Sequence, residues 1–351
     1  MLENEVHQYE VKKINETLIS YIRIVAKSRV DLKQPFQMLK SELGSRIIGP
    51  GMTIFHYDTG VKEGFDAEVA YPVSEPFESG NIKSRVLECI DAFVHTYHGP
   101  YDKMAPVSTD VHQYRNSRGL AAWLSPREVY LQGPFMDNPE DNVTEIQVGI
   151  HDWERRFLRS LDDILGEEKK KEILQGYESI SPYSTAEERA CWLSGAVKRL
   201  DSIADEPEKY EVIARCAHVH PQENIDRFRV IYEKTGDLDE VIKFLRTDLP
   251  FVEEPYREGN IIYTSKPPAN PDAYKDATTQ EEIIKAYCFC PVVKAALETM
   301  PRTFCYCGAG WARQFWQGVT GKPVVKVDIL ETVVDQGKKC KFAVHLPVGA
   351  T

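Results

Sequence analysis

The chain has 351 residues, 42% of them hydrophobic and 28% charged, which is typical of a globular protein and long enough to predict two domains, residues 1–150 and 151–351. A formal net charge of −11 argues against nucleic acid and anionic membranes as partners and is compatible with a cationic ligand. No apolar run has the length of a membrane span and the N-terminus lacks signal-peptide features, so we expect a cytoplasmic protein.

The first half of the chain predicts a strand–helix–strand–strand unit. Strand-like runs fill residues 5–27, and a helix follows Pro35, because Phe36, Leu39 and Leu43 recur at the spacing of one helix face. Residues 52–57 and 65–73 then alternate or cluster apolar side chains as strands do.

The same order of elements recurs from residue 86. A strand over 86–97 precedes a helix that carries Met104, Val107, Val111 and Tyr114, and strands at 127–131 and 143–150 follow. The last strands of the two units align, with Glu145 at the position of Glu68. Four elements recurring in one order predict a duplicated βαββ unit whose halves form one curved sheet around a cleft.

The stretch from Trp123 to Pro134 is the strongest candidate for a binding site. Val129 and Leu131 alternate with Glu128 and Tyr130, so Glu128 and Tyr130 share one strand face. A carboxylate beside aromatic rings is the combination that holds an organic cation. The alternative is that Glu128 lies on a solvated strand face, as most glutamates do.

Residues 5–150 also resemble the gyrase-inhibitor-like (GyrI-like) ligand-binding domain, known as the AraC-type effector-binding domain or SOUL-like fold. Five pieces of sequence carry the resemblance in order: Gly-Pro-Gly-Met-Thr-Ile-Phe-His-Tyr-Asp from residue 49, Asp-Ala-Glu-Val-Ala-Tyr-Pro-Val from 66, His-Gly-Pro-Tyr from 98, Arg-Glu-Val-Tyr-Leu from 127 and Thr-Glu-Ile-Gln-Val from 144. The resemblance implies a duplicated βαββ fold that binds bulky cationic or amphipathic molecules, as in multidrug binding.

The resemblance further implies that Glu128 supplies the counter-charge and that aromatic residues line the cleft. The candidates for that lining are Phe55, Tyr57, Tyr71, Trp123 and Tyr130, and Glu145 is a second candidate carboxylate. Packing in the core is the alternative for Phe55 and Tyr71, and a solvated sheet face is the alternative for Glu68 and Glu145. In regulators that use this domain a helix-turn-helix module precedes it, and here we expect none, because the domain begins within a few residues of Met1.

The second half changes to helical periodicity and predicts an α+β domain. Residues 167–172 form a charged, solvated helix face, and capping boxes at Ser184-Thr185 and Thr278-Thr279 begin further helices. A loop-rich stretch over 256–274 surrounds a short strand at 260–264, and strands over 322–330 and 340–346 pair at the end. The fold class is therefore α+β, a duplicated βαββ domain followed by a mostly helical domain that ends in paired antiparallel strands.

The predicted site residues beyond the cleft are eight cysteine and histidine side chains, all of them in this half of the chain. Eight cysteines in a cytosolic chain are more typical of thiols or metal ligands than of disulfides. Thiolates and imidazoles hold zinc, and thiolates alone hold an iron–sulfur cluster. The alternative to metal binding is ordinary packing, because cysteine is a small apolar side chain and a Cys-x-Cys strand places both sulfurs on one face. The candidate ligands are Cys216, His218, His220, Cys288, Cys290, Cys305, Cys307 and Cys340.

The C-terminal text also resembles a prokaryotic domain family whose tail is similar to the ligand-binding domain named after 4-vinyl reductase. The residues concerned are Cys-Tyr-Cys-Gly-Ala-Gly-Trp from 305, Gly-Lys-Pro-Val-Val-Lys-Val from 321 and Gly-Lys-Lys-Cys-Lys-Phe-Ala-Val-His from 337. Lys338 departs from the family, which tends to have aspartate there. The resemblance implies a small-molecule-binding or sensing domain.

Three functions follow from these patterns. The first is a binding or sensing protein for a small organic ligand, with no DNA-binding module. The second is a GyrI-like hydrolase of a reactive small molecule, in which Glu128 is the general base and Tyr57 or Tyr130 assists. The third is thiol or metal chemistry at Cys305 or Cys307 with His218 or His220.

Overall fold

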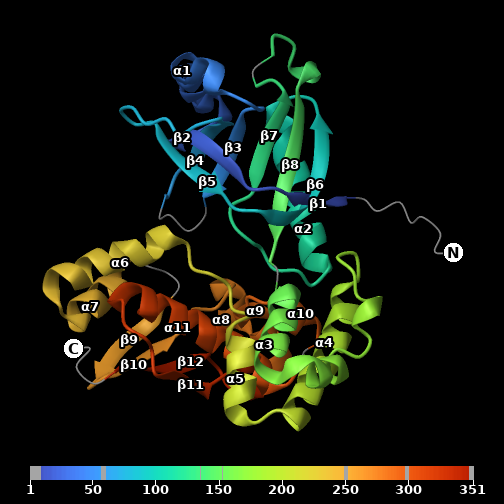
Figure 1. Ribbon diagram of the computed structural model, residues 1–351, viewed down its shortest axis with the longest axis vertical. Coiled ribbons are helices and arrows are strands. Elements are labelled where there is room, and N and C mark those ends of the chain that lie inside the picture. The colour runs from blue at the N-terminus through green and yellow to red at the C-terminus, as the bar shows by residue number, and fades with distance from the viewer. Residues whose placement is uncertain are drawn as a thin grey trace. The chain divides into compact units, whose positions relative to one another are not determined.

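The computed structural model describes residues 9–56, 61–134, 136–151, 153–248, 252–296 and 300–347. The chain divides into an N-terminal unit, Met1–His151, and a C-terminal unit, Asp152–Thr351. Both units mix helices and antiparallel strands, so the α+β prediction is confirmed (Figure 1).

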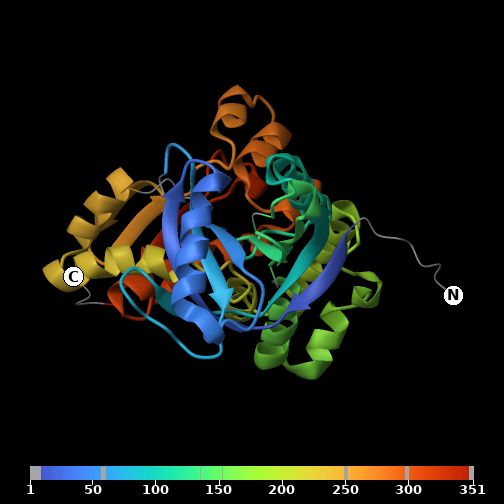
Figure 2. The ribbon, with the colours of Figure 1, turned by 90° about the horizontal axis from the view of Figure 1, so that it is seen from above.

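The N-terminal unit is one eight-stranded antiparallel sheet in the order β1-β6-β8-β7-β3-β4-β2-β5, with two helices (Figure 2). Its elements are β1 Glu10–Ile14, β2 Thr17–Ala26, η1 Arg29–Leu32, α1 Lys33–Leu43, η2 Gly44–Arg46, β3 Met52–His56, β4 Phe65–Pro72, β5 Lys83–Leu87, β6 Ile90–His98, η3 Tyr101–Lys103, α2 Met104–Ser117, β7 Arg127–Gln132, η4 Pro139–Asp141 and β8 Val143–Ile150. The duplication is confirmed, because β2-α1-β3-β4 and β6-α2-β7-β8 repeat one order. The predicted strand at 86–97 is two strands, since the chain leaves β5 after Leu87 and enters β6 at Ile90.

The two repeats meet where β3 pairs with β7, and the strand register makes Thr53 the counterpart of Glu128. Thr53 lies opposite Glu128 across this junction. Thr53 pairs outward with Val69 on β4, and Glu128 pairs outward with Ile146 on β8. Because paired residues of a sheet point to the same face, these four side chains share one face.

The helices lie on that face. The apolar stripe of α1 buries Phe36, Leu39 and Leu43 in one cluster with Val69 and Tyr130 from the sheet, so the predicted one-face spacing is confirmed. The face with Glu128 therefore lies against the helical layer of the unit, while its neighbours Arg127 and Val129 point to the other face.

The C-terminal unit is mostly helical and contains a four-stranded antiparallel sheet in the order β11-β12-β10-β9. Its elements are α3 Trp153–Ile173, η5 Tyr177–Ser179, α4 Ala186–Ile203, α5 Glu206–Ala214, α6 Gln222–Thr235, α7 Leu238–Asp248, β9 Glu253–Glu258, β10 Ile261–Ser265, α8 Pro271–Asp276, α9 Gln280–Tyr287, α10 Pro291–Ala295, η6 Arg302–Cys305, α11 Tyr306–Thr320, β11 Lys326–Glu331, η7 Val333–Asp335 and β12 Lys341–His345. The predicted pair of C-terminal strands is confirmed as β11 and β12. The stretch read as a loop around residue 256 is instead strand β9, paired with β10.

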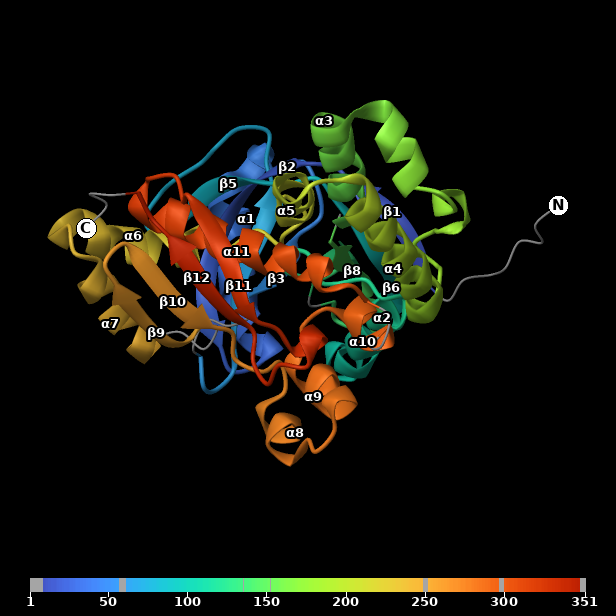
Figure 3. The same cartoon turned by 90° about the horizontal axis from the view of Figure 1, so that it is seen from below.

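Two clusters of buried side chains form the core of this unit. One joins helices α3, α4 and α5 with α9 and α10, and the other joins α6, α7 and α11 with the sheet. Helix α11 packs against β11 and β12, as Figure 3 shows. The capping boxes predicted at Thr185 and Thr279 begin α4 and α9.

Helix α11 approaches α5 closely at Gly310, where a side chain has no room. A Cβ atom there would lie 2.0 Å from the backbone oxygen of Ala214, whereas one at Gly195 in α4 would lie 3.2 Å from the flexible end of Arg199. We expect Gly310→Ala to destabilise the protein by about 1–3 kcal/mol, because overpacking outweighs the better helix propensity of alanine. Gly195→Ala is the matched control and should be neutral or stabilising. Differential scanning calorimetry of both variants tests this, and equal melting temperatures would contradict the close contact.

Candidate functional site

Glu128 lies on β7 in the middle of the N-terminal sheet and is only 3% exposed. A small cavity of 120 Å³ opens beside it, lined by Arg29, Phe55, Ala105, Ser108, Pro126, Arg127, Glu128 and Ile146. The alternative of a solvated strand face for Glu128 is therefore wrong. A buried carboxylate needs a cation or several hydrogen bonds to remain ionised.

That cation is Arg29, which stands at the start of η1. Its guanidinium donates to both oxygens of Glu128, with Nη2 to Oε1 at 2.6 Å and Nη1 to Oε2. Burial raises the pKa of Glu128, and the Arg29 guanidinium opposes that rise. Burial likewise acts against the charge of Arg29, but the Glu128 carboxylate outweighs it and raises the arginine pKa. Arg29 is thus the main group that favours the charged form of Glu128 against the effect of burial.

Aromatic rings surround the ion pair, as expected for a cation site. The Arg29 guanidinium carbon lies 5.2 Å from the centroid of the Phe55 ring, which places a cation over an aromatic face. Tyr130 is buried, and its ring contacts that of Tyr101 with centroids 5.5 Å apart. Phe55 and Tyr130 are positions that correspond in the two repeats, so both halves of the sheet supply a ring.

The hydroxyl of Tyr130 connects Glu128 to Thr53. The Tyr130 hydroxyl donates to Glu128 Oε2 at 3.4 Å and lies 2.8 Å from the Thr53 hydroxyl. Burial, followed by the Glu128 charge, raises the pKa of Tyr130 well above its ordinary value. The prediction that Glu128 and Tyr130 act together is consistent with this contact, and the phenol is held as a proton donor.

Some predicted ligand-binding residues lie elsewhere in the N-terminal unit. Glu145 pairs with Val129, so it lies on the opposite face of the sheet from Glu128, where it accepts from Lys12 at 3.0 Å. Trp123 packs with a buried cluster of Ile90, Ala92 and Val94, away from Glu128. For Glu145 the cause is strand alternation, which sends adjacent side chains to opposite faces, whereas Trp123 lies before β7 and outside the strands.

Tyr71 and Tyr57 are the remaining residues that were predicted to bind the ligand. Tyr71 shares the face of Glu128 but packs against Phe36 with ring centroids 5.7 Å apart, which agrees with a core role. Tyr57 lies outside the described residues. Arg29 and Tyr101 were not among the candidates, since both precede helices in loop-like sequence that carries no periodic signal.

Glu68, the counterpart of Glu145, is buried rather than solvated. It is 3% exposed and accepts from Arg85 Nη2 at 2.5 Å, and His56 Nε2 lies 3.2 Å from its other oxygen. Burial opposes ionisation of Glu68, but the His56 contact and the Arg85 guanidinium outweigh burial and lower its pKa. The expected solvated face is therefore wrong for Glu68, because Arg85 reaches it from β5, the strand beyond β2 in the sheet.

The C-terminal unit brings five of its predicted cysteine ligands to one cavity of 110 Å³. Cys288, Cys290, Cys305, Cys307 and Cys340 line it, together with His218. The two Cys-x-Cys pairs do not lie on strands, because one stands between α9 and α10 and the other where η6 meets α11. Among the described residues no three His, Cys, Asp or Glu side chains are arranged to hold a metal ion.

The other two predicted metal ligands lie apart from that cavity. The Cys216 thiol is buried and donates to the Val212 carbonyl at 3.2 Å. His220 stacks on Trp311 with ring centroids 4.1 Å apart, and burial lowers its pKa to about 3. Zinc and iron–sulfur binding stay predictions for the five cavity cysteines.

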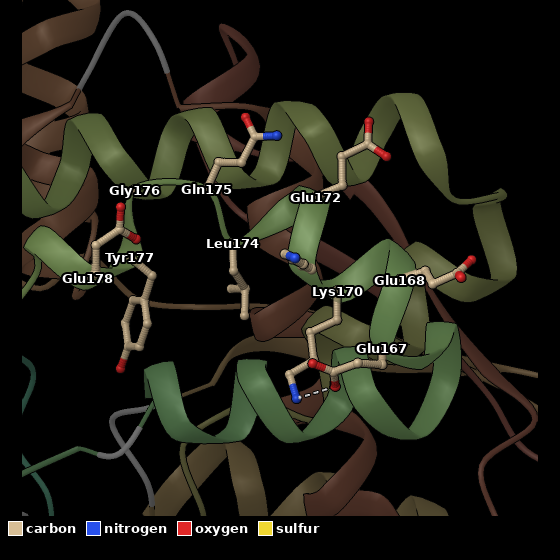
Figure 4. Close-up of a pocket in the computed structure, with 10 residues that line it drawn as sticks. Glu167, Glu168, Lys170, Glu172, Leu174, Gln175, Gly176, Tyr177 and Glu178 are labelled. Atoms are coloured by element: carbon tan, nitrogen blue, oxygen red, sulfur yellow. Dashed lines mark hydrogen bonds and ion pairs between the residues drawn. The ribbon is translucent and has the colours of Figure 1, made fainter.

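A surface depression of 800 Å³ lies at the end of α3 (Figure 4). Its rim consists mainly of exposed charged side chains, and Lys170 forms ion pairs with Glu167 at 3.1 Å and Asp162 at 3.3 Å. Gly166, at φ +77°, interrupts the helix just before this charged run. The groove fits the predicted solvated helix face and shows no convergent catalytic groups.

Comparison with known proteins gives structural neighbours for part of the chain. No family model matches it, and no curated protein matches it. The EcmrR C-terminal domain is similar over 42% of this chain and 98% of its own length, at 22% identity and a TM-score of 0.37. A hydrolase from Listeria innocua is similar over 40% of this chain and 91% of its own length, at 12% identity and a TM-score of 0.30. SAV2435 bound to tetraphenylphosphonium is similar over 42% of this chain and 97% of its own length, at 16% identity and a TM-score of 0.29. All three TM-scores lie below 0.5, so these likenesses support no conclusion about fold or function.

Within the described part of the chain, no helix combines the length and the apolar character that a membrane crossing requires.

The contacts of Glu68 with Arg85 and His56 predict that the stability of the folded protein falls in acid. Because the pKa of Glu68 is lowered in the folded state, its contribution to stability is full above the ordinary value of 4.5 and is lost as the pH falls through the lowered pKa. We expect Glu68→Gln to cost about 1–3 kcal/mol at pH 7, because Arg85 loses its charged partner, and to cost progressively less below pH 4.5. Thermal melts of the variant and the parent between pH 7 and pH 3 measure this difference.

Glu75→Gln is the matched control, since Glu75 accepts from Arg46 at 2.9 Å but is well exposed. It should show no comparable pH-dependent difference. A Glu68→Gln penalty that stayed constant across this pH range would contradict the assignment.

Proposed function

We propose that the N-terminal unit binds an organic cation at Glu128, and that Arg29 closes the site until the ligand displaces its guanidinium. The observation that carries the proposal is the bidentate contact between Arg29 and a carboxylate that is 3% exposed. The chain supplies its own cation at the position where the ligand's charge would sit.

The exchange is favoured by a rule of buried electrostatics. An ionised carboxylate in an apolar sheet is costly without a counter-charge, so the site selects between two cations rather than between occupied and empty states. Arginine carries a delocalised, weakly hydrated charge and stacks on Phe55. A ligand with a similarly diffuse charge and an aromatic surface can replace it at the smallest desolvation cost.

The size of the cavity supports the displacement of Arg29. Ligand pockets for organic molecules usually have volumes of about 300–1000 Å³, and the cavity beside Glu128 has 120 Å³. The Arg29 side chain itself lines this cavity and is 23% exposed, so its route to solvent is open. Withdrawal of Arg29 would enlarge the site and free both oxygens of Glu128 together.

The same contacts weigh against the hydrolase alternative. A general base needs a free oxygen within hydrogen-bonding distance of the water that it activates, and Arg29 engages both oxygens of Glu128. Tyr130 has a pKa well above its ordinary value, because burial and the Glu128 charge oppose its ionisation. The carboxylate therefore fits charge recognition better than proton abstraction.

Isothermal titration calorimetry with tetraphenylphosphonium chloride at pH 8 tests the proposal. Arg29→Met should raise the affinity roughly tenfold, because the ligand no longer competes with a tethered cation. The affinity of Arg29→Lys should lie between those of Arg29→Met and the parent, since lysine cannot form the bidentate contact with Glu128. Glu128→Gln should abolish binding, because it removes the charge at nearly constant shape.

Arg46→Met is the matched control. Arg46 also pairs with a carboxylate, Glu75, and its guanidinium lies 5.1 Å from the Phe77 ring centroid, but this pair is on the surface. Its removal should leave the affinity unchanged. Equal affinities for the parent, Arg29→Met and Glu128→Gln, each shown by circular dichroism to be folded, would leave the ion pair a purely structural contact and sink the proposal.

A further inference from the structure

The cysteine-lined cavity of the C-terminal unit is a mostly apolar space. It lies among α11, the C-terminal strands and the segment between α9 and α10. Besides the five cysteines, aromatic and aliphatic side chains form most of its wall, namely Trp153, Tyr287, Phe289, Val293, Phe304, Ile329, Val333, Val334 and Phe342. The cavity exists because cysteine, at five positions, fills little volume.

The charge that lines this cavity is positive, whereas the whole chain is acidic. The chain has 54 acidic residues, yet none of the residues that line the cavity is Asp or Glu. Lys266 lines it, and among the described residues its ammonium forms no ion pair with a carboxylate; its Nζ lies 4.7 Å from the centroid of the Trp311 ring. A cation beside an apolar space attracts an anionic group.

A second polar group in the wall has the same preference. The indole N–H of Trp153 is buried in this wall, and the group it contacts is the sulfur of Cys307. A thiol sulfur is only a weak hydrogen-bond acceptor. Lys266 and Trp153 both offer hydrogens to a ligand and no negative charge.

The five thiols line this space as small side chains. Cys305 Sγ lies 3.2 Å from the Thr332 hydroxyl, and Cys340 Sγ lies 3.9 Å from the same oxygen. Protonated thiols are small, polarizable and nearly apolar, which suits contact with a hydrocarbon or aromatic ring.

We propose that this cavity binds a small apolar monocarboxylate, with Lys266 as the counter-charge and the five thiols around the hydrophobic part. An engineered cavity of about 150 Å³ in another protein binds benzene, so a volume of 110 Å³ sets an upper size near a single aromatic ring or a short branched chain. The site is independent of Glu128, since it lies in the other unit.

Binding of benzoate, measured by isothermal titration calorimetry on the full chain, tests the charge. Benzoate should bind, and benzamide, of nearly the same shape but neutral, should bind at least tenfold more weakly. Lys266→Met keeps most of the side-chain volume and should weaken benzoate binding at least tenfold while changing benzamide binding little. Lys275→Met, at an exposed lysine of α8 that pairs with Asp272, is the matched control and should behave as the parent.

The native cysteines provide a second readout. Saturating benzoate should slow alkylation by iodoacetamide of Cys288, Cys290, Cys305, Cys307 and Cys340, read by peptide mass spectrometry. The exposed thiols of Cys89 and Cys191 serve as internal controls and should react at an unchanged rate. This readout works for any folded variant.

Two results would overturn the proposal. One is benzoate binding that is absent, or that persists undiminished in folded Lys266→Met. The other is zinc or iron at one or more equivalents per chain in the purified protein, with the five thiols protected without benzoate and exposed by a chelator. That outcome would make the cavity a thiolate metal site.

Discussion

A buried carboxylate must have a cation, and this requirement organises the centre of the N-terminal unit. Glu128 lies in the middle of an eight-stranded sheet, on the face that the helices cover. Arg29 donates to both of its oxygens and the Tyr130 hydroxyl to one of them, and these contacts favour the charged form against the effect of burial. Removing one member of such a pair from a protein interior costs about 3–5 kcal/mol, so sequence change around Glu128 is constrained by charge before it is constrained by shape.

The position of this pair at the junction of the repeats has a physical cause. Within the described sheet, β3 and β7 are the one pair of neighbouring strands that joins the two βαββ halves, so residues there are covered by elements from both. The first repeat provides Arg29 from η1 and Phe55 from β3, and the second provides Tyr101 from η3 and Tyr130 from β7. A site on this junction takes its residues from both repeats, so a single unduplicated unit could not form it.

The recurrence of four elements in one order was enough to predict the duplicated fold, and strand alternation was enough to predict the shared face of Glu128 and Tyr130. Alternation was not enough to place Glu145, since a residue one step along a strand points to the other face and only the full register decides which. Trp123 could not be placed in this way, because it lies before β7 and outside the strands. Arg29 escaped prediction for a different reason. Its partner is 99 residues away in sequence, and a lone arginine between a strand and a helix has no periodic signature. The convergence of five cysteines likewise depends on long-range packing, although their concentration in one half was visible in the sequence.

The register also explains why the repeats had to differ where they meet. Thr53 is the counterpart of Glu128 and lies directly opposite it, and paired Cβ atoms in a sheet are about 4.5–5.5 Å apart. A glutamate at both positions would place two buried carboxylates side by side, and one would have to take up a proton. Threonine at the first position instead contributes a hydroxyl 2.8 Å from that of Tyr130, which orients the phenol toward the single carboxylate. A duplicated sheet can therefore carry one buried negative charge at its centre but not two, and the symmetry of the fold is broken at the residue where the charge lies.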